Sequence, residues 1–487
     1  MAARNGEQYI RGLDDQRVLW VGDKQVSVLG EPTFSGSLRG LAGYYDWQHQ
    51  HADECLVTDP VSGEPMSASL IVPRNAADLA ARRRCFERIA RYSRGMMGRT
   101  PDYVNTTLAG FVARADLLSS TGDTTGAERL QKFYREVVEG DLALTHTIVQ
   151  PAIDRSVDDL SGMNAELAAR VVRRTETGVV IRGAKVLATL GPFADELFVY
   201  PSAPLPPQAD PSVALMFSIP VDTKGLIQVC RDHYGLARST ADMPFSSRFD
   251  EQDSFVIFDD VEVPYERLFI DGDIAAYNSL IRGGWHANIS QQTNVRAAVK
   301  LEFAYDLGCR MAAILNAGKR PEVALALGEI LEYARLTRAS LDIGEAKARD
   351  WGNGAFFPDD QATRATRAML PDWMVRANEL LIGLGSHNLL ATPTMAAFDN
   401  PAMAPMLERY LPGADGHSAR ERAQVFRTAW DFVGSALGSR NALYERFYLG
   451  SRARALSGDH MQAQMAKPPQ AIGPAEEFFQ DAAKFKS

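Results

Sequence analysis

The sequence predicts an α+β fold with three parts: a helical N-terminal domain (residues 1–142), a central β-domain (143–272) and a C-terminal helical bundle (273–487). Three observations predict it. The chain of 487 residues is long enough for two or three domains. Short apolar runs bounded by Gly, Pro or Asp gather in its middle, which is typical of strands. Apolar residues at three- and four-residue steps continue through long stretches of the last third, which is typical of helices.

The first part mixes short loops with helical patterns. Asn75 followed by an acid at Asp78 favours a helix start. Leu79, Phe86 and Ile89 then recur at helical spacing among arginines. We expect this apolar face to enter the core and the arginines to stay in water.

The middle part contains five apolar runs separated by turn residues. The first, residues 179–189, is interpreted as two short strands broken at Gly183. The others cover residues 196–200, 212–221, 225–229 and 254–263. Several short strands with turns between them favour a small barrel or sandwich.

One connection in this part, residues 201–212, contains five prolines. Because proline donates no backbone hydrogen bond, this stretch cannot belong to a paired strand and is expected to be a surface loop. It is either a flap over a pocket or an ordinary exposed connection, and the residues alone favour the second.

Four long amphipathic runs follow, each long enough for five helical turns and joined by short polar loops. They cover residues 294–315, 321–343, 359–384 and 419–437. This pattern favours an antiparallel four-helix bundle with Trp430, Phe432 and Val433 in its core. A helical block, a β-domain and a four-helix bundle is the order found in acyl-CoA dehydrogenase-like flavoproteins, an analogy of fold that does not give function.

Composition excludes several classes of function. A formal net charge of −9 without a concentrated basic face argues against nucleic acid binding. The first twenty residues lack an apolar core of signal-peptide length, and no later run is suited to spanning a membrane, so a cytoplasmic location is expected. Cys55, Cys85, Cys230 and Cys309 are widely spaced without a CxxC pair, which favours reduced thiols over disulfides or a zinc site.

The common nucleotide and hydrolase motifs are absent. No GxGxxG follows a strand, since Gly383-Leu384-Gly385 lacks the third glycine, and no GxxxxGK(S/T) occurs. HExxH, GxSxG and clustered His or Cys residues are missing too. No site for a metal, for NAD(P)H or for a nucleoside triphosphate is therefore expected.

Candidate chemistry lies in two short segments. Arg99 and Tyr103 are four residues apart, so their side chains can share one side of a helix or tight turn. His146 lies in a largely apolar stretch, and its side chain can exchange a proton near neutral pH. Around a phenol oxygen, these groups would stabilise the phenolate, whose ortho carbon an electrophilic oxygen donor attacks. A lone histidine in an apolar stretch is more often a hydrogen-bonded core residue, and the residues alone leave that alternative open.

Seven segments along the chain resemble segments of a known family. They are GEQYIRGLDDQRVLWVGDKQV, GRTPDYVN, THTIVQPAIDRS, GVVIRGAKVLATLGPFADE, PFSSRFDEQDSFVIFDDVEVP, VRAAVKLEF and AWDFVGSALGSRNALYERFYLGS. Each alone is modest, but their order and spacing together are specific. Over nearly its whole length the chain resembles the 4-hydroxyphenylacetate 3-monooxygenase oxygenase components, which are two-component flavin-dependent phenol hydroxylases.

The resemblance implies the site residues. The family's phenol-binding trio falls on Arg99, Tyr103 and His146, all intact here. The implied flavin-contacting positions are His146, Thr147, Ile148, Ala152, Ile153, Asp154, Arg155, Thr189, Tyr448, Leu449, Gly450 and Ser451. Of these, Thr189 can donate a hydrogen bond to the polar edge of the flavin, and Arg155 can meet phosphate charge.

The resemblance also implies the activity. A separate NAD(P)H:flavin reductase supplies reduced FAD, which fits the missing dinucleotide motif. FAD and O2 then hydroxylate a phenol to a catechol through a C4a-hydroperoxyflavin, in a site that excludes water. His146 favours ionisation of the phenol, while Arg99 and Tyr103 hold the negative charge. The implied assembly is a homotetramer built as a dimer of dimers, with contacts from the helical bundle.

The substrate loop is where the chain departs from the family pattern. The family meets the tail of its substrate near positions that fall on Pro204, Leu205 and Pro206. The stretch 201–212 lacks an Arg or Lys that would pair with a free carboxylate. 4-Hydroxyphenylacetate is therefore a doubtful substrate, and a larger or less charged phenol fits equally well: a tyrosine-derived group tethered to a carrier as a thioester, or a chlorinated or nitro-substituted phenol.

Three alternatives share this fold. A 4-hydroxybutyryl-CoA dehydratase holds an iron–sulfur cluster through cysteines, and in that relative cysteines occupy the places of Arg99 and Tyr103. An acyl-CoA dehydrogenase binds FAD tightly and needs a glutamate base; Glu329 or Glu332 is a candidate, although helices routinely carry exposed glutamates. A non-catalytic binding protein is the third, and the intact trio argues against it.

Overall fold

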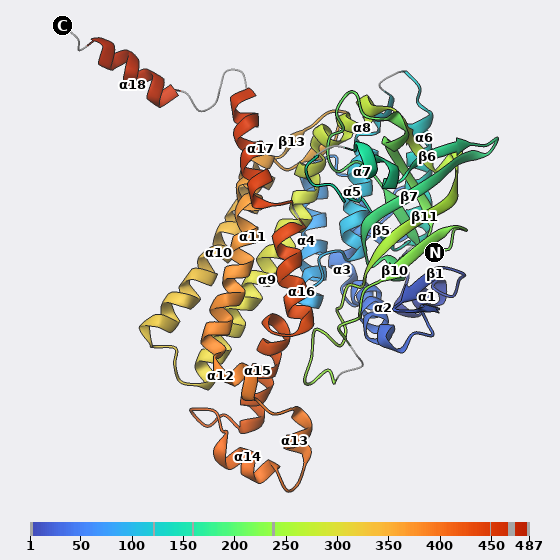
Figure 1. Cartoon of the computed structure of the whole chain (residues 1–487). Coiled ribbons are helices and arrows are strands. Elements are labelled where there is room, and N and C mark those ends of the chain that lie inside the picture. The colour runs from blue at the N-terminus through green and yellow to red at the C-terminus, as the bar shows by residue number, and fades with distance from the viewer. Residues whose placement is uncertain are drawn as a thin grey trace.

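The computed structural model of the chain describes residues 3–119, 122–157, 160–235, 239–448, 450–465 and 473–484. In Figure 1 the N-terminal helices (blue and cyan) lie between the mostly green strands and the long yellow and orange helices. This mixed helix-and-sheet architecture confirms the expected α+β fold class.

The N-terminal helices begin and end where local signals place them. They are α1 (Gly6–Gly12), α2 (Ser35–Gln50), α3 (Ala52–Cys55), α4 (Ala76–Ser93), α5 (Pro101–Ala113) and α6 (Thr125–Gly140). The Asn75 side chain accepts hydrogen bonds from the first amides of α4, as its position predicted. Leu79, Phe86 and Ile89 on that helix are buried, which confirms the apolar face.

Two sheets form the middle of the molecule. The larger has the strand order β2-β1-β10-β11-β7-β6 and the smaller β12-β9-β8-β5. Their strands are β1 (Val18–Val21), β2 (Lys24–Val26), β5 (Leu144–His146), β6 (Arg170–Arg174), β7 (Gly178–Thr189), β8 (Glu196–Val199), β9 (Leu215–Pro220), β10 (Leu226–Cys230), β11 (Asp253–Pro264) and β12 (Leu268–Asp271). Buried side chains of both sheets share one core, where Phe217 and Phe258 pack edge to face. The arrangement is therefore a sandwich.

Two details of the sheets differ from the sequence interpretation. Residues 179–189 form part of one strand, β7, and do not break at Gly183. Gly183 has a φ of +124°, and a Cβ there would lie 2.3 Å from the carbonyl oxygen of Ala168, so the close approach requires glycine. Beside it the pairing of β7 with β11 shifts register at a β-bulge between Phe258 and Val261 of β11, while β7 continues. The second difference is that β1 and β2, from a region where only loops and helices were expected, extend the larger sheet.

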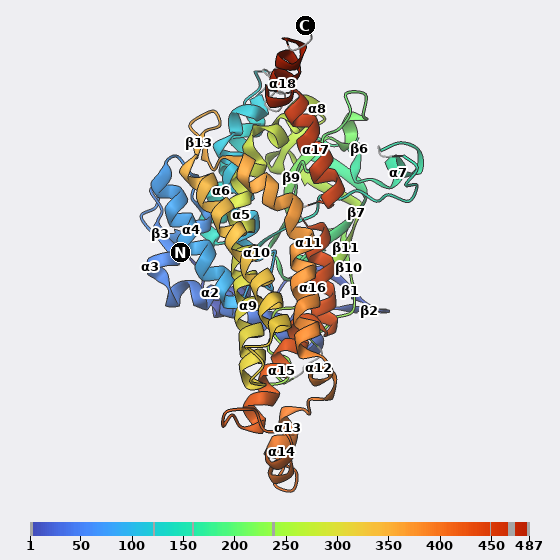
Figure 2. The same cartoon turned by 90° about the vertical axis from the view of Figure 1, so that its left-hand side faces the viewer.

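The C-terminal third is a helical bundle. Its long helices are α9 (His286–Ile314), α10 (Pro321–Ala346), α11 (Asp360–Gly385), α15 (Ala419–Val433) and α16 (Ala436–Phe447), and they lie alongside one another in Figure 2. Phe432 and Val433 are buried and Trp430 packs against the same core, as expected. The bundle joins the N-terminal helices, because α4 and α5 pack against α9.

The bundle departs from the expected pattern in two places. The fourth predicted helix, 419–437, is interrupted after Val433, because the Ser435 side chain caps a new helix, α16. The connections are also longer than expected. A hairpin of β13 (Arg349–Asp350) and β14 (Phe356–Phe357) joins α10 to α11. Three short helices separate α11 from α15: α12 (His387–Ala391), α13 (Met395–Asp399) and α14 (Ala404–Tyr410).

Smaller elements complete the fold. They are the hairpin β3 (Leu56–Thr58) with β4 (Pro65–Ser67), and the helices α7 (Gly162–Leu167), α8 (Ile274–Leu280), α17 (Arg452–Met465) and α18 (Gly473–Lys484). A kinked turn, Ile281–Trp285, joins α8 to α9, with non-helical dihedral angles at Gly283 and Gly284. All four cysteines are free thiols, as expected. None of the helices in the described ranges combines the length and apolarity that crossing a bilayer requires.

Candidate active site

Arg99 and Tyr103 face each other at the start of α5. Thr100 is the N-cap residue and Pro101 occupies the first helical position, which suits its fixed φ, so Arg99 lies just outside the helix. The Arg99 guanidinium carbon lies 3.8 Å from the centre of the Tyr103 ring. This cation–π contact is the shared side that the four-residue spacing predicted.

His146 approaches the same place from the sandwich. It ends β5, where it pairs with Phe198 of β8. Its ring centre lies 5.5 Å from that of Tyr103 and 5.5 Å from that of Tyr200. Arg99, Tyr103 and His146 are therefore brought together, although residue 146 is far from α5 in sequence. All three side chains are buried.

Burial sets the protonation state of the imidazole. Desolvation, followed by the positive charge of Arg99, holds the pKa of His146 well below its usual value. The ring is therefore neutral at neutral pH and has one nitrogen able to accept a hydrogen bond. It can polarise a neighbouring O–H group without bringing a second positive charge beside Arg99.

Arg99 and His146 contribute to one wall of a cavity of about 410 Å³. Thirteen residues line it: Arg99, His146, Ile148, Val149, Val186, Leu187, Thr189, Asp253, Arg440, Leu443, Tyr444, Phe447 and Tyr448. The large apolar side chains among them remain partly open, with Leu443 60% and Phe447 59% exposed. Exposed apolar side chains around a hollow are typical of a ligand site.

A buried ionic network connects the two sides of this cavity. Glu251 accepts a hydrogen bond from the Arg99 amide at 2.5 Å and another from Arg440 at 2.9 Å. Arg440, on α16, also binds Asp253 at 2.7 Å, and Asp253 accepts the Thr189 hydroxyl at 2.9 Å. Although burial opposes ionisation, the adjacent arginines hold the pKa of Asp253 below its usual value. The start of α5, the end of β7 and the middle of α16 are thus tied together.

Sequence reasoning gave no role to this network. Glu251 and Asp253 lie in the segment PFSSRFDEQDSFVIFDDVEVP and Arg440 in AWDFVGSALGSRNALYERFYLGS, both of which carried the resemblance. The available signal was three acids in four residues, 250–253, next to a strand that buries its alternate side chains. A carboxylate cluster in such a place requires cationic partners.

The positions implied to contact flavin fall into two groups. Ile148, Thr189 and Tyr448 join His146 in the cavity wall. The Thr147 hydroxyl instead donates to the Leu187 carbonyl and is buried. The remaining described positions lie outside the cavity lining, mostly exposed: Ala152, Ile153, Asp154, Arg155, Gly450 and Ser451. Leu449 lies outside the described residues.

The Thr189 hydroxyl is already engaged as a donor. Because its proton goes to Asp253, the oxygen is left to accept a hydrogen bond rather than to donate one. Thr189 donating to a flavin edge stays a prediction, and it requires the hydroxyl to turn away from Asp253. An N–H of the ring would be its matching partner.

The proline-rich connection is a loop, as expected, and it is anchored beside the cavity. The amide and carbonyl of Leu205 both bind the side chain of Asn278 on α8, each at 2.8 Å. The Ser202 hydroxyl donates to the carbonyl of Ile148, a cavity residue. Pro204 is exposed, whereas Leu205 and Pro206 are half-buried.

The chemistry of the cavity suits a planar aromatic group with polar edges. Among the described residues, the Arg99 Nη1, Tyr444 Oη and Tyr448 Oη atoms are buried without a hydrogen-bond partner. Buried polar atoms rarely stay unpaired, so these point to a bound ligand. Gly450 has a φ of +87°, which places its backbone where a side chain would be strained. A flavin ring and a phenol both meet these demands.

The groups that the alternative enzymes need lie elsewhere. Glu329 pairs with Arg376 and Tyr333 on the bundle surface, and Glu332 pairs with Arg335. Neither lines the cavity, nor does any of the four cysteines. Within the described ranges, no cluster of His, Cys, Asp or Glu is suited to a metal ion.

Comparison with known proteins supports the same family that the sequence resembles. The family model described as 4-hydroxyphenylacetate 3-hydroxylase N terminal matches residues 5–270, and its C-terminal counterpart matches residues 279–471. The 4-hydroxyphenylacetate 3-monooxygenase oxygenase component of Thermus thermophilus is 34% identical over 455 residues, 93% of each chain. A Streptomyces globisporus monooxygenase is 32% identical over 457 residues, 92% of this chain and 85% of the relative. Its name gives its substrate as a 3-amino-3-(3-chloro-4-hydroxyphenyl)propanoyl group on a peptidyl-carrier protein.

Solved structures of the same family are also similar to this chain. The oxygenase component of 4-hydroxyphenylacetate 3-monooxygenase complexed with FAD and 4-hydroxyphenylacetate has a TM-score of 0.90 at 32% identity, covering 99% of this chain and 98% of that chain. A 4-hydroxybutyryl-CoA dehydratase from N. maritimus has a TM-score of 0.86 at 16% identity over 100% of this chain and 96% of that chain, which shows a shared fold alone. Because the family models cover most of its length and the Thermus relative matches 93% of it, the chain belongs to the 4-hydroxyphenylacetate 3-hydroxylase family.

Proposed function

We propose that this chain is the oxygenase component of a two-component flavin-dependent monooxygenase. It converts a phenol, O2 and reduced FAD into a catechol, water and oxidised FAD, with the new hydroxyl ortho to the first. The observation that carries the proposal is the cluster of Arg99, Tyr103 and His146 at an otherwise largely apolar cavity. The Thermus relative is named as the oxygenase of such an enzyme, and the structural neighbour holds FAD with a phenol.

The residues that hold FAD in this proposal surround the cavity. Thr189 accepts from the ring, and the backbone of Tyr448 and Gly450 lies along it, with Gly450 allowing close approach. Val186, Leu187 and Phe447 cover its apolar faces and exclude water. Bound reduced FAD supplies, with O2, the electrophilic oxygen atom. Positions 152–155 belong to the same proposal as outer contacts, where the exposed Arg155 can meet phosphate charge.

His146 and Arg99 act together on the phenol hydroxyl. The neutral imidazole accepts a hydrogen bond from the O–H and weakens its hold on the proton. The unpartnered Nη1 of Arg99 donates to the same oxygen and stabilises the phenolate charge. The Tyr103 ring packs against the guanidinium and holds it in place, and its hydroxyl is the proposed second donor to the anion. A phenolate delivers electron density to its ortho carbon, which is the position to be hydroxylated.

The partner and assembly follow from the same proposal. A separate NAD(P)H:flavin reductase supplies reduced FAD, consistent with the missing GxGxxG motif. The protein assembles as a homotetramer of three-domain subunits, with domains over residues 1–142, 143–272 and 273–487. Apolar side chains exposed on the long helices support contacts there, among them Leu325, Leu336, Ile343 and Ile382.

The substrate is a phenol whose tail carries no free carboxylate at loop 201–212. No Arg or Lys occurs in this loop, and Leu205 is its half-buried member beside Asn278. Pro204, Leu205 and Pro206 offer an apolar contact to the tail. A tail tethered to a carrier, as in the name of the Streptomyces relative, or a chlorinated or nitro-substituted ring fits this loop.

The test supplies chemically reduced FAD and O2 to the purified protein with a panel of phenols. We expect mass spectrometry to find a product that gains one oxygen atom with at least one phenol. His146→Ala should bind FAD with near-parent affinity and form little product. Near-parent hydroxylation by His146→Ala would refute the assigned role, and no oxygenated product from any phenol would refute the activity.

A further inference from the structure

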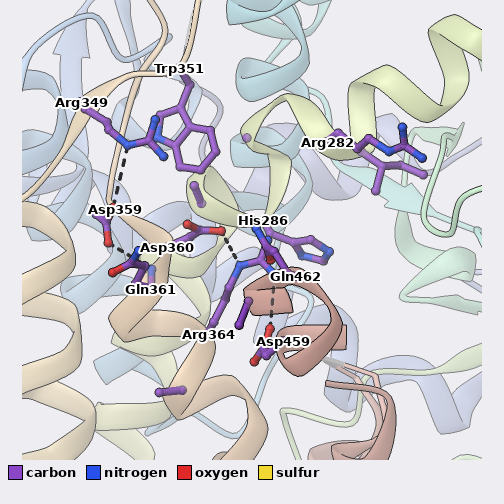
Figure 3. Close-up of a pocket in the computed structure, with 15 residues that line it drawn as sticks. Arg282, His286, Arg349, Trp351, Asp359, Asp360, Gln361, Arg364, Asp459 and Gln462 are labelled. Atoms are coloured by element: carbon purple, nitrogen blue, oxygen red, sulfur yellow. Dashed lines mark hydrogen bonds and ion pairs between the residues drawn. The ribbon is translucent and has the colours of Figure 1, made fainter. Parts of the chain in front are cut away.

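A second cavity, of about 630 Å³, opens between the start of α9, the start of α11 and α17 (Figure 3). A smaller hollow continues it inward and shares His286, Asp360 and Arg364 with it. The inner hollow is also lined by Arg367. None of the residues of either cavity takes part in the proposed hydroxylation.

The lining of these cavities is rich in arginine. Arg282, Arg349 and Arg364 line the outer part, together with Asp359, Asp360 and Asp459. Arg364 forms ion pairs with Asp360 and, at 3.3 Å, with Asp459 (Figure 3). Arg349 lies 3.8 Å from Asp359. The acids are therefore already occupied by arginines.

Arg282 is left as an uncompensated charge. It is exposed at the cavity, and among the described residues it makes no ion pair or hydrogen bond. In the same part of the structure, no group of acids and histidines is suited to a metal ion. The positive charge of Arg282 therefore favours an anion in the cavity, whereas the three aspartates are paired with arginines and do not favour a cation.

The pKa of His286 is affected by the positive charges of nearby arginines. Burial is the largest cause that lowers its pKa, to about 3, and the charges of Arg367, Arg364 and Arg454 add to it. Three arginines thus act on one imidazole from nearby. The ring is neutral at neutral pH and presents hydrogen-bonding nitrogen atoms rather than a further charge.

Trp351 adds an unused donor. Its indole N–H is buried without a hydrogen-bond partner among the described residues, and its ring lies in the outer wall (Figure 3). The Arg349 guanidinium carbon lies 4.0 Å from the centre of that ring, which fixes both side chains. An oxygen-rich anion would provide the acceptor that this N–H lacks.

The backbone kinks at the wall of the cavity, between α8 and α9. Gly283 and Gly284 have non-helical dihedral angles there, and Gly284 has a φ of +99°. A Cβ at Gly284 would lie 2.9 Å from the Phe357 ring and 3.1 Å from Trp351. The kink therefore requires a glycine where the chain passes close to Trp351.

The inner hollow lies near Gly450, one of the positions implied to contact flavin. A Cβ added at Gly450 would lie 3.5 Å from Nη2 of Arg367, which lines the inner hollow.

We propose that this arginine-lined cavity binds a phosphate ester or diphosphate group of a ligand that reaches the active site. Arginine forks suit phosphate oxygens, and the neutral His286 and the Trp351 N–H supply further hydrogen bonds. This chemistry has two possible sources: the diphosphate of FAD, or the phosphate of a pantetheine arm that carries the phenol as a thioester. The site does not depend on which source is used, nor on the hydroxylation mechanism.

The test is calorimetric titration of the full-length, flavin-free protein with pyrophosphate, ADP, coenzyme A and FAD. Arg282→Glu reverses a charge that holds no structural contact, and Arg335→Glu, on the exposed surface of α10, is the matched control. We expect Arg282→Glu to weaken binding of at least one phosphate probe about tenfold or more, the loss of one charge-assisted contact. Arg335→Glu should bind like the parent, and thermal unfolding should be alike for all three proteins.

The probes distinguish the two sources. If FAD and ADP weaken in Arg282→Glu, the cavity holds the diphosphate of the cofactor. If coenzyme A weakens while FAD does not, it holds a pantetheine phosphate. Trp351→Phe, which deletes only the N–H and keeps an aromatic wall, should weaken the same probe. The proposal is overturned if no probe binds the parent, or if Arg282→Glu and Arg335→Glu bind every probe as the parent does.

Discussion

Arg440 binds Asp253 through two hydrogen bonds, from Nη2 to Oδ1 at 2.7 Å and from Nε to Oδ2 at 3.0 Å. The pair is buried beside the candidate active site and joins α16 to β11. Its outer contacts, Glu251 on one side and Thr189 on the other, lead to Arg99 and to the proposed flavin edge. The Arg440 guanidinium therefore ties the start of α5, which carries Arg99, to the end of β7, which carries Thr189.

Replacing the Arg440 guanidinium should lower the stability of the protein. Arg440→Met keeps the aliphatic part of the side chain but leaves Glu251 and Asp253 buried without their shared cation, and Asp253 retains only Arg231. We expect the free energy of unfolding, measured with urea, to fall by about 3–5 kcal/mol, as for other buried ion pairs that lose one partner. Arg376→Met, which removes an exposed pair with Glu329, is the control and should leave the unfolding midpoint unchanged. Equal effects of the two substitutions would contradict a structural role for the network.

Arg99→Lys tests charge against geometry at the phenol oxygen. Lysine keeps the positive charge but loses the planar fork that lies over Tyr103 and donates to the Tyr448 carbonyl at 3.3 Å. We expect single-turnover hydroxylation with reduced FAD to slow by about 100-fold or more, the usual effect of losing one transition-state donor. FAD affinity in a fluorescence titration should change little. Arg91→Lys, on the exposed face of α4, should behave as the parent; a similar rate for Arg99→Lys would show that charge alone suffices.

Much of the fold could be predicted from local pattern. The cap at Asn75 and the helical steps of Leu79, Phe86 and Ile89 are local signals, and the structure follows them. The bulge beside Gly183 could not be predicted, because a glycine within a strand pattern fits a break and a bulge equally well. The membership of β1 and β2 in the larger sheet depends on parallel pairing between β1 and the distant β10, which a local pattern cannot contain.

The residues of the candidate site also fall into those that a local pattern predicts and those that depend on distant contacts. Arg99 and Tyr103 could be paired from their spacing, whereas the approach of His146 to them depends on how β5 joins β8. Only the family resemblance joined the three in advance. Arg440 and Glu251 were missed because they meet across 189 residues and neither forms a motif with its chain neighbours.

The stability of the protein should fall in acid through its buried histidines. The folded-state pKa of His146 is depressed by burial and by Arg99, whereas the unfolded value is about 6.5. The unfolded chain therefore takes up the proton first, so this contribution to stability is complete above about pH 6.5 and is lost as the pH falls below it. His146→Asn should flatten the dependence between pH 6.5 and 5 by up to about 1.4 kcal/mol per pH unit.

The measurement is urea unfolding at a series of pH values, and the exposed His387→Asn is the control. Other buried groups also titrate in this range, with the pKa of Asp102 raised to about 6 by burial, for example. The difference in slope between parent and variant isolates His146 from them. Parallel profiles for parent and His146→Asn would mean that the imidazole is not held neutral.

Two glycines should respond to alanine in opposite directions. Gly284 lies at the kink between α8 and α9 with a φ of +99°, and a Cβ there would press on the Phe357 ring at 2.9 Å. Gly328 lies inside α10, and a Cβ there would meet nothing within 4 Å. Gly284→Ala should therefore destabilise the protein by about 1–3 kcal/mol, through backbone strain and the clash. Gly328→Ala should stabilise it by up to about 1 kcal/mol, because alanine is the better helix former. Urea unfolding gives both values, and a tolerated Gly284→Ala would show that the turn relaxes to an ordinary helix, which would also move Arg282 relative to His286.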